Sequence, residues 1–230
     1  MERNNRIRRT RRRRIAGPLG ILLFVLAIIG LMAVILWVGH LAVSLFDDSA
    51  AAARYEKFVQ PVVMMDPVPF ARIENIDEIT LLQSSLWGAL LGENRGNYAQ
   101  DDNGLLLIPS SDVDVAAARL FGPSVRLNHQ TFDDYDVSYL FDPEISAYRV
   151  PYVAKVAYSP KVVSIDKKGD TISLKVGYVS PGNILSTSMA GENGQKGPLP
   201  DKYMYYDLQN GEDGYYIKAV RDLENAMAIS

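Results

Sequence analysis

The residues whose types and spacing best suit catalysis lie in one short stretch, HQTFDDYD, which begins at His129. It combines a histidine with three aspartates, of which Asp133 and Asp136 are the most site-like. A histidine beside a carboxylate can act as a general base or as a metal ligand, because its pKa lies near neutrality. The alternative is structural, a histidine at a sheet edge followed by an acidic turn. We favour this alternative, and we keep His129, Asp133 and Asp136 as the candidate catalytic residues of an enzyme.

Other chemistry is sparse in this sequence. The chain has no cysteine, which excludes disulfides, thiolate nucleophiles and cysteine-based metal sites. Residues 101–104, DDNG, are similar to part of a calcium loop, but the spacing and the terminal Glu of an EF-hand are missing. No nucleophile elbow, phosphate-binding glycine loop or HExxH motif is present in the sequence. We therefore expect no metal, no cofactor and no enzymatic activity.

Tyrosines are concentrated toward the C-terminal end of the chain. Five of the 13 tyrosines lie in the last predicted hairpin: Tyr203, Tyr205, Tyr206, Tyr215 and Tyr216. Tyrosine offers a large contact area with a polar tip, so this hairpin can form a platform that binds carbohydrate or protein. Tyrosine is also a common strand residue, and a purely structural role is the alternative.

The first part of the chain contains a long apolar run, from Leu19 to Phe46. Its 28 residues include no Asp, Glu, Lys or Arg. A bilayer core of about 30 Å needs roughly 20 such residues in a helix, so we expect a transmembrane helix over residues 15–46. The second histidine, His40, lies in this run and cannot share a metal with His129. The alternative is a signal peptide cleaved near Ala51–Ala53, but signal h-regions are usually only about 7 to 15 residues long.

The residues before the apolar run form an arginine-rich tail, residues 1–14. This tail holds eight of the 24 Lys and Arg residues and one of the 27 acidic residues, which leaves 16 basic and 26 acidic side chains elsewhere. Basic segments stay on the cytoplasmic side, so the tail predicts a cytoplasmic N-terminus and a C-terminal domain outside the cell membrane. The residues that carry this topology are Arg8, Arg9, Arg11, Arg12, Arg13 and Arg14. The tail lacks interleaved aromatic residues, and we expect the lipid bilayer as its partner and no nucleic acid.

The rest of the chain is expected to form a stalk and one domain. Residues 47–60 are polar and alanine-rich, which predicts a juxtamembrane helix or stalk that Pro61 ends or kinks. Residues 61–230 are then the extracytoplasmic domain. Their number suffices for one well-buried core and leaves little room for a second domain.

Two helices are predicted early in this domain. Apolar residues at helical spacing predict the first helix over residues 76–91, with Asn75 as its N-cap. The sequence SSDVDVAAARLFGP, from Ser110 to Pro123, predicts the second helix. Ser111 and Asp114 form a capping pattern at its start, and Gly122-Pro123 is a stop signal.

Alternation of apolar and polar residues then predicts a series of strands. Residues 161–180 have the pattern of a hairpin with its turn at residues 167–170, and a later hairpin pairs residues 203–208 with 215–220. Helices followed by strands give an α+β class, with about three helices packed on a curved antiparallel sheet. This element order is similar to that of the NTF2-like (cystatin-like) fold.

At IPSSDVDVAAARLFGP, continuing through VRLNHQTF, the sequence resembles uncharacterised single-pass membrane proteins of Gram-positive bacteria. The resemblance covers most of the domain, from about Pro67 to Gly182, and it implies no activity, substrate or site residues. The overall architecture is also similar to that of type IV secretion scaffold subunits, which have one membrane helix and an outer NTF2-like domain. No motif supports that second similarity.

These observations together predict a non-enzymatic, membrane-anchored extracytoplasmic scaffold or binding module of the bacterial cell envelope. Its expected partner is an envelope protein or a second copy of the chain. The alternatives are an envelope hydrolase and a small-ligand sensor that use the acidic cluster around His129.

Overall fold

The structure is a computed structural model, and it describes residues 26, 29–34, 49–134, 137–151, 157–185, 198–212 and 214–222. It divides into two units, Met1–Ala50 and Ala51–Ser230. The arginine tail, His40, Asp136 and most of the predicted transmembrane helix lie outside the described residues.

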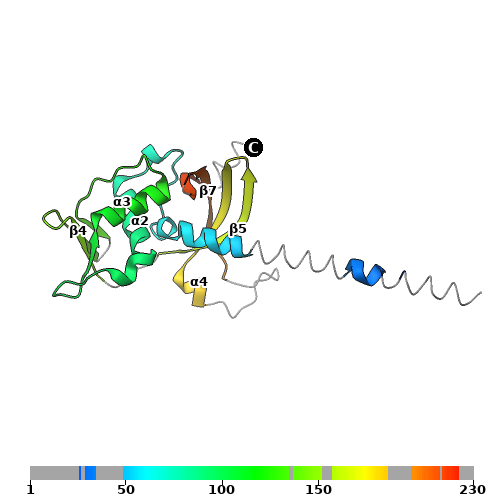
Figure 1. Cartoon of the computed structure of the whole chain (residues 1–230), viewed down its shortest axis with the longest axis horizontal. Helices are drawn as coiled ribbons and strands as arrows, with labels where there is room; N and C mark the ends of the chain where they lie inside the picture. The colour runs from blue at the N-terminus through cyan, green and yellow to red at the C-terminus, as the bar shows by residue number, and fades with distance from the viewer. Residues whose placement is uncertain are drawn as a thin grey trace, which may run out of the picture. The chain divides into compact units, whose positions relative to one another are not determined.

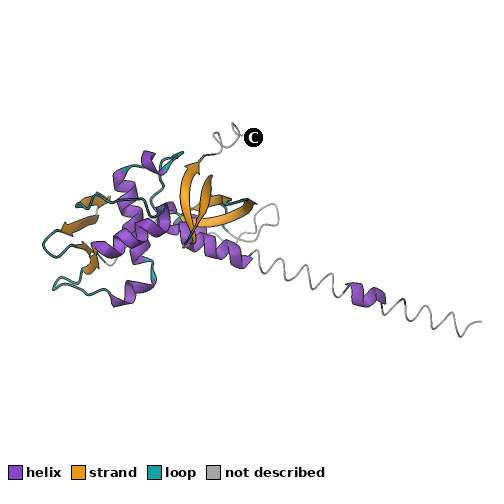
Figure 2. Ribbon diagram, turned by 45° about the horizontal axis from the view of Figure 1, so that its top comes forward, coloured by secondary structure: helices purple, strands orange, loops and turns teal. Residues whose placement is uncertain are grey.

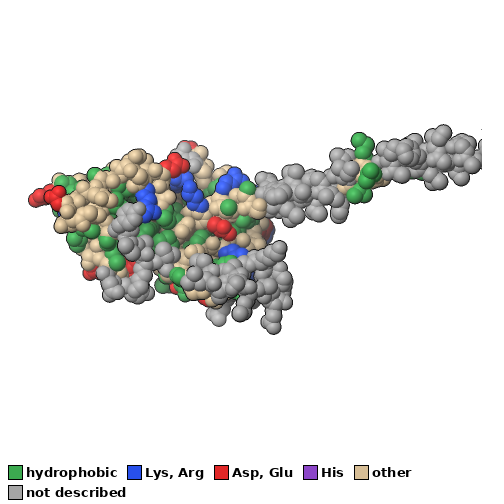
Figure 3. All heavy atoms as spheres, turned by 90° about the horizontal axis from the view of Figure 1, so that it is seen from below, with side chains coloured by type: hydrophobic (Ala, Val, Ile, Leu, Met, Phe, Trp, Pro, Cys, Tyr) green, Lys and Arg blue, Asp and Glu red, His purple; other side chains and the backbone are tan. Residues whose placement is uncertain are grey.

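In the first unit, residues 29–34 are helical. The large apolar side chains of this short stretch and of Leu26 are between 55% and 64% exposed, and Figure 3 shows them in green. Among the described residues, no helix has both the length and the apolar character that crossing a membrane requires.

The second unit is an α+β domain. Its first helix covers residues 49–63 from the end of the first unit onward and is called helix 49–63 here. The other helices are η1 (Ile73–Asn75), α2 (Glu78–Leu90), η2 (Glu93–Asn97), α3 (Ser110–Phe121) and α4 (Pro181–Leu185). The strands are β1 (Leu106–Pro109), β2 (Phe132–Asp134), β3 (Val137–Asp142), β4 (Ala147–Val150), β5 (Ser159–Lys168), β6 (Thr171–Val179), β7 (Lys202–Gly211) and β8 (Gly214–Arg221).

The strands form two antiparallel sheets, in the orders β1-β4-β3-β2 and β5-β6-β7-β8. Figure 2 shows the two groups of strands with helices between them. The expectation of one curved sheet is therefore wrong. The reason lies in the pairing of β4: β1 and β3 occupy its two edges, so β5 cannot pair with it and belongs to the other sheet.

Each sheet has its own buried core. The β1–β4 core contains α2 residues such as Leu86 and Trp87, and the β5–β8 core contains residues of helix 49–63 such as Val59. Helix α3 contributes to both, with Val113 in the first core and Phe121 in the second. In Figure 1, α2 and α3 accordingly lie between β4 and the sheet that contains β5 and β7.

Helix 49–63 is part of the folded domain and not a free stalk. Tyr55, Val59, Val62 and Val63 are all at most 6% exposed and belong to the β5–β8 core. The domain therefore begins at Ala51, before the boundary expected at residue 61. Pro61 does not end the helix, which continues to residue 63.

Both predicted helices exist, but their caps differ from the expected ones. Helix α2 is capped by Asp77, whose side chain accepts hydrogen bonds from the Thr80 amide and hydroxyl, whereas Asn75 lies in η1. Helix α3 begins at Ser110 without a side-chain cap, so the expected capping by Ser111 is wrong. Gly122 ends α3 as predicted, with a φ of 97° that favours glycine.

The two predicted hairpins are confirmed. Strands β5 and β6 pair from Lys168 and Thr171 back to Ser159 and Val179, and Gly169 in the turn has a φ of 58°. One face of β6 is buried: Ile172, Leu174, Val176 and Tyr178. Strands β7 and β8 are longer than expected and pair up to Gly211 and Gly214.

Candidate functional site

The structure places His129 in a segment without strand pairing, between α3 and β2. Its Nδ1 lies 2.9 Å from the Tyr148 hydroxyl, and its ring stacks on Phe141 at 5.4 Å between centroids. Its Nε2 lies 3.3 Å from Asp114 Oδ1, but these atoms do not have hydrogen-bond geometry. The carboxylate that faces His129 therefore comes from α3 and not from the acidic stretch that follows it in sequence.

The acidic stretch does not assemble around the histidine. Asp133 lies on β2, and its Oδ1 accepts a 2.6 Å hydrogen bond from the Ser138 hydroxyl at the exposed surface. Asp136 lies outside the described residues. His129 is only 18% exposed and is surrounded by aromatic rings, one of which, Tyr148, has its pKa raised to about 12 mainly by burial. This arrangement fits a packed, structural histidine.

The tyrosines of the last hairpin separate into three groups. Tyr206 is fully buried, and its hydroxyl lies 2.5 Å from that of Tyr178. Tyr203 and Tyr205 lie beside cations, with Lys175 Nζ at 4.8 Å and Arg221 Cζ at 5.7 Å from their respective ring centroids. Tyr215 and Tyr216 face α3 instead.

A groove runs between α3 and the end of the β7–β8 hairpin, with a cavity volume of about 700 Å³. We call it the α3 groove. Val115, Ala118 and Arg119 line it from α3, and Tyr215 and Tyr216 line it from β8. Val115 is 68% exposed and Tyr215 is 41% exposed, so two apolar surfaces face solvent on opposite walls of the same groove.

Close packing behind this groove fixes its aromatic wall. The ring of Tyr216 lies against Gly122, where a Cβ atom would come within 3.2 Å of Tyr216 Cδ2. The ring of Tyr215 contacts Tyr55 of helix 49–63 at 5.7 Å between centroids. Burial, and then the hydrogen bond with Tyr215, raises the pKa of Tyr55 to about 12.

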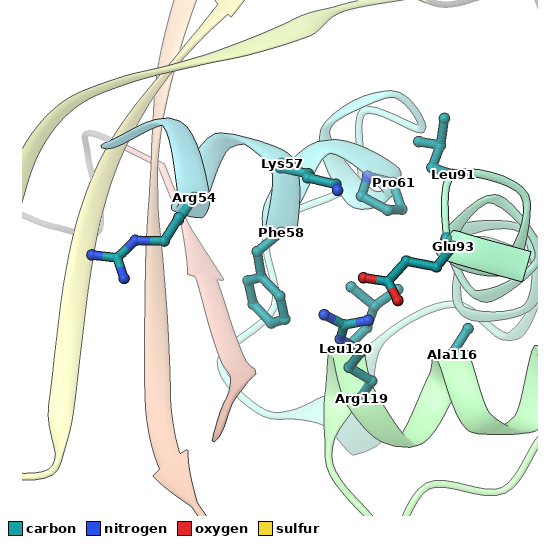
Figure 4. A pocket seen from close by; sticks show the side chains of 11 residues that line it. Arg54, Lys57, Phe58, Pro61, Leu91, Glu93, Ala116, Arg119 and Leu120 are labelled. Atoms are coloured by element: carbon teal, nitrogen blue, oxygen red, sulfur yellow. The ribbon is translucent and has the colours of Figure 1, made fainter. Parts of the chain in front are cut away.

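Arg119 also lines a second cleft, of about 300 Å³, between helix 49–63, α2 and α3. Figure 4 shows Phe58 and Leu120 within it, with Lys57 and Arg119 extending toward it and Glu93 pointing toward Arg119. We call it the cationic cleft. A third hollow of about 270 Å³ continues from it along α3 to Tyr98 and shares Arg119 with the other two.

A separate hollow of about 280 Å³ brings two carboxylates together, those of Asp66 and Asp134. Tyr158 also lines it. Asp66 has a φ of 48°, an uncommon conformation for a residue other than glycine, and its carboxylate forms an ion pair with Lys202. Among the described residues, no group of three or more His, Asp and Glu side chains is placed to hold a metal ion.

Most of these residues were not singled out from the sequence. Val115 lies off the buried face of α3, which consists of Val113, Ala116, Ala117, Leu120 and Phe121. An apolar residue on the polar face of an amphipathic helix could therefore have indicated an interaction surface from the sequence alone. Its partner across the groove, Tyr215, is 100 residues further along the chain, and no local pattern indicates that the two are neighbours.

Comparison of the chain with known protein families, with curated proteins and with solved structures found no match.

Proposed function

We propose that this protein is a membrane-anchored binding module of the bacterial cell envelope. Its N-terminus lies in the cytoplasm, its α+β domain lies outside the cell membrane, and it acts without catalysis. The partner is another envelope protein, which contacts the α3 groove.

The anchor is supported by the apolar run over residues 19–46 and by the described residues within it. Leu31, Met32 and Val34 are helical and more than half exposed. A helix that is apolar on all sides needs an apolar environment, which a bilayer provides. The arginine tail supports the orientation.

Two measurements on cells that produce the full chain test this part. The protein should remain in the membrane fraction after alkaline carbonate washing and enter solution only with detergent. Protease added to intact spheroplasts should remove the α+β domain and spare an epitope placed before Arg3. A protein released by carbonate, or a domain protected while the tag is cut, contradicts the proposal.

The observation that carries the binding role is the pair of exposed apolar walls in the α3 groove. Exposed apolar surface inside a concave site marks an interaction surface more often than scattered apolar residues do. Tyr215 adds a rigid aromatic contact. Arg119 adds a guanidinium group, which lines both this groove and the cationic cleft. Tyrosine and arginine are the residue types that most often dominate interface energies.

Site-specific photocrosslinking tests the binding role. A photoreactive amino acid at Val115 should give one discrete adduct in intact cells, and the second change Tyr215→Ser should abolish it. The same amino acid at Ile145, which is 50% exposed at the end of a different hairpin, is the matched control and should give none. Equal adducts at both positions, or none at Val115, would contradict the proposal, and an adduct of twice the chain mass would identify a second copy as the partner.

A second candidate function is hydrolysis in the envelope with a carboxylate pair. The observation that favours it is the hollow that Asp66 and Asp134 share, because paired carboxylates can divide acid and base roles. Asp134→Asn should then abolish a phenotype that Asp133→Ala and His129→Ala leave intact. A phenotype that survives all three changes excludes both this pair and the cluster around His129.

The resemblance to single-pass membrane proteins of Gram-positive bacteria is part of this proposal and supports the envelope setting. The likeness to NTF2-like secretion scaffold subunits is not part of it. Those subunits place helices over one strongly bent sheet, and this domain has two sheets of four strands.

A further inference from the structure

The cationic cleft differs from every other hollow described above in its charge. Its rim carries three cations, Arg54, Lys57 and Arg119, and a single carboxylate, Glu93. The chain after the arginine tail has 16 basic and 26 acidic residues, so a net positive cleft runs against the balance of its surroundings. Such a local excess of positive charge selects an anionic ligand.

Among the described residues, these three cations form no close ion pair, although Glu93 points toward Arg119 (Figure 4). In the described part of the chain, no carboxylate oxygen lies within 4.0 Å of a side-chain nitrogen of Arg54, Lys57 or Arg119. All three are exposed, whereas the half-buried Arg149 and Arg221 are paired, each at 2.7 Å, with Asp142 and Asp207. Unpaired cations around a concave site leave their hydrogen-bond donors available to a ligand.

The interior of the cleft is apolar. Phe58 and Pro61 line it from helix 49–63, and Leu91 and Leu120 line it from the end of α2 and from α3 (Figure 4). Helices α2 and α3 approach closely at Gly88, where a Cβ atom would come within 2.9 Å of Leu120 Cδ1. The cleft therefore offers apolar contacts in its interior and charged hydrogen-bond donors at its rim.

We propose that the cationic cleft binds an amphipathic anion, a phosphate monoester that carries an apolar chain. Arg119 and Lys57 hold the phosphate, since a guanidinium fork and an ammonium suit its several oxygens. The first carbons of the chain lie on Phe58 and Leu120. This proposal is independent of the protein partner, because the α3 groove shares only Arg119 with this cleft.

The volume of the cleft limits what it can take. A cavity of about 300 Å³ corresponds to roughly ten water molecules at about 30 Å³ each. This space accommodates a phosphate group and a few methylene groups. The remainder of a longer chain would lie outside the cleft.

The test uses the full chain in micelles of a non-ionic detergent. The probe is a short-chain phosphatidic acid with a photoreactive group next to its phosphate. The arginine tail also attracts anionic lipids, so the readout is the peptide that becomes labelled and not the total amount bound. We expect labelling of the peptides that contain Phe58 and Leu120. A matched phosphatidylcholine probe should not label them.

Variants separate the contributions of head group and chain. Lys57→Gln and Arg119→Gln should each reduce labelling of the cleft about tenfold, because each removes a charged hydrogen-bond donor. Lys167→Gln, at an exposed position near the end of β5, removes the same charge elsewhere and should leave labelling unchanged. Phe58→Ala should reduce labelling while leaving the far-ultraviolet circular dichroism unaltered.

Competition identifies the source of the phosphate. Unlabelled short-chain phosphatidic acid should compete at concentrations at least tenfold below those needed of inorganic phosphate. Equal competition by inorganic phosphate would overturn the role of the apolar chain. Labelling by phosphatidylcholine, or an equal loss in Lys167→Gln, would overturn the site. Failure at the α3 groove together with success here would leave this proposal standing.

Discussion

The phenol oxygens of Tyr178 and Tyr206 lie 2.5 Å apart on neighbouring strands, and both residues are fully buried. One hydroxyl donates to the other within the β5–β8 core. Burial raises the pKa of both groups well above the ordinary value for tyrosine. The two hydroxyls therefore stay neutral, and each is the hydrogen-bond partner of the other in an apolar environment.

Removing both hydroxyls should cost less than the sum of the costs of removing each one. Tyr178→Phe or Tyr206→Phe leaves a single buried hydroxyl without its partner, which costs roughly 1–3 kcal/mol. The double variant removes both polar groups, and its loss should be smaller than the sum of the single losses. Urea unfolding of the four proteins, followed by the fluorescence of Trp87 with Trp37 replaced by Phe, measures this coupling. Additive losses would show that the two hydroxyls do not interact.

The domain should lose stability at alkaline pH. The pKa of Tyr98 is raised to about 12, first by burial and then by its hydrogen bond to Asp112 Oδ2 at 3.0 Å. Unfolded tyrosine titrates near 10.0, so this stabilisation is complete below that pH and is lost as the pH rises toward 12. The urea midpoint should fall between about pH 9 and about pH 11, and it should fall less in Tyr98→Phe. Identical pH profiles for the two proteins would contradict this assignment.

Gly122 should tolerate no side chain. Its φ of 97° disfavours other residues, and a Cβ atom would press on the Tyr216 ring. Gly122→Ala should therefore destabilise the domain by roughly 1–3 kcal/mol. Gly96 has open space around it and no positive φ, so Gly96→Ala is the control that should change stability by less than about 0.5 kcal/mol. Thermal unfolding followed by circular dichroism distinguishes the two, and equal shifts would refute the packing argument.

The start of α2 offers a direct comparison between the expected and the observed cap. Asp77 accepts a 2.9 Å hydrogen bond from the Thr80 amide, and Asn75 makes no such contact with α2. Asp77→Ala should cost about 1 kcal/mol, and Asn75→Ala should cost little. Urea unfolding of both variants measures this. A larger loss of unfolding free energy in Asn75→Ala than in Asp77→Ala would show that Asn75 is the N-cap, as the sequence predicted.

Features that depend on neighbours in sequence were predictable. The β5–β6 hairpin follows from the alternation in β6 and from Gly169, which supplies the positive φ of the turn. The stripe of α3 and its end at Gly122 follow from helical spacing and from the same property of glycine. In each case the determining residues lie within a few positions of one another.

Features that depend on distant pairing were not predictable. Strand β1 pairs with β4, so that Leu106 lies opposite Val150, and this pairing separates the first sheet from the second. The α3 groove likewise joins Val115 to Tyr215. The carboxylate opposite His129 comes from Asp114, because the turn after α3 folds the chain back over that helix. Local sequence patterns contain no information on such contacts between residues far apart in the chain.

Helix α3 supplies Val113 and Ala116 to one core and Leu120 and Phe121 to the other. A fragment that contains only β5–β8 would expose the apolar surface that the end of α3 covers, and a fragment that ends within α3 would leave the first sheet incomplete. The two sheets are therefore not separable modules. Removing either sheet should therefore expose apolar side chains of α3 that its core now covers.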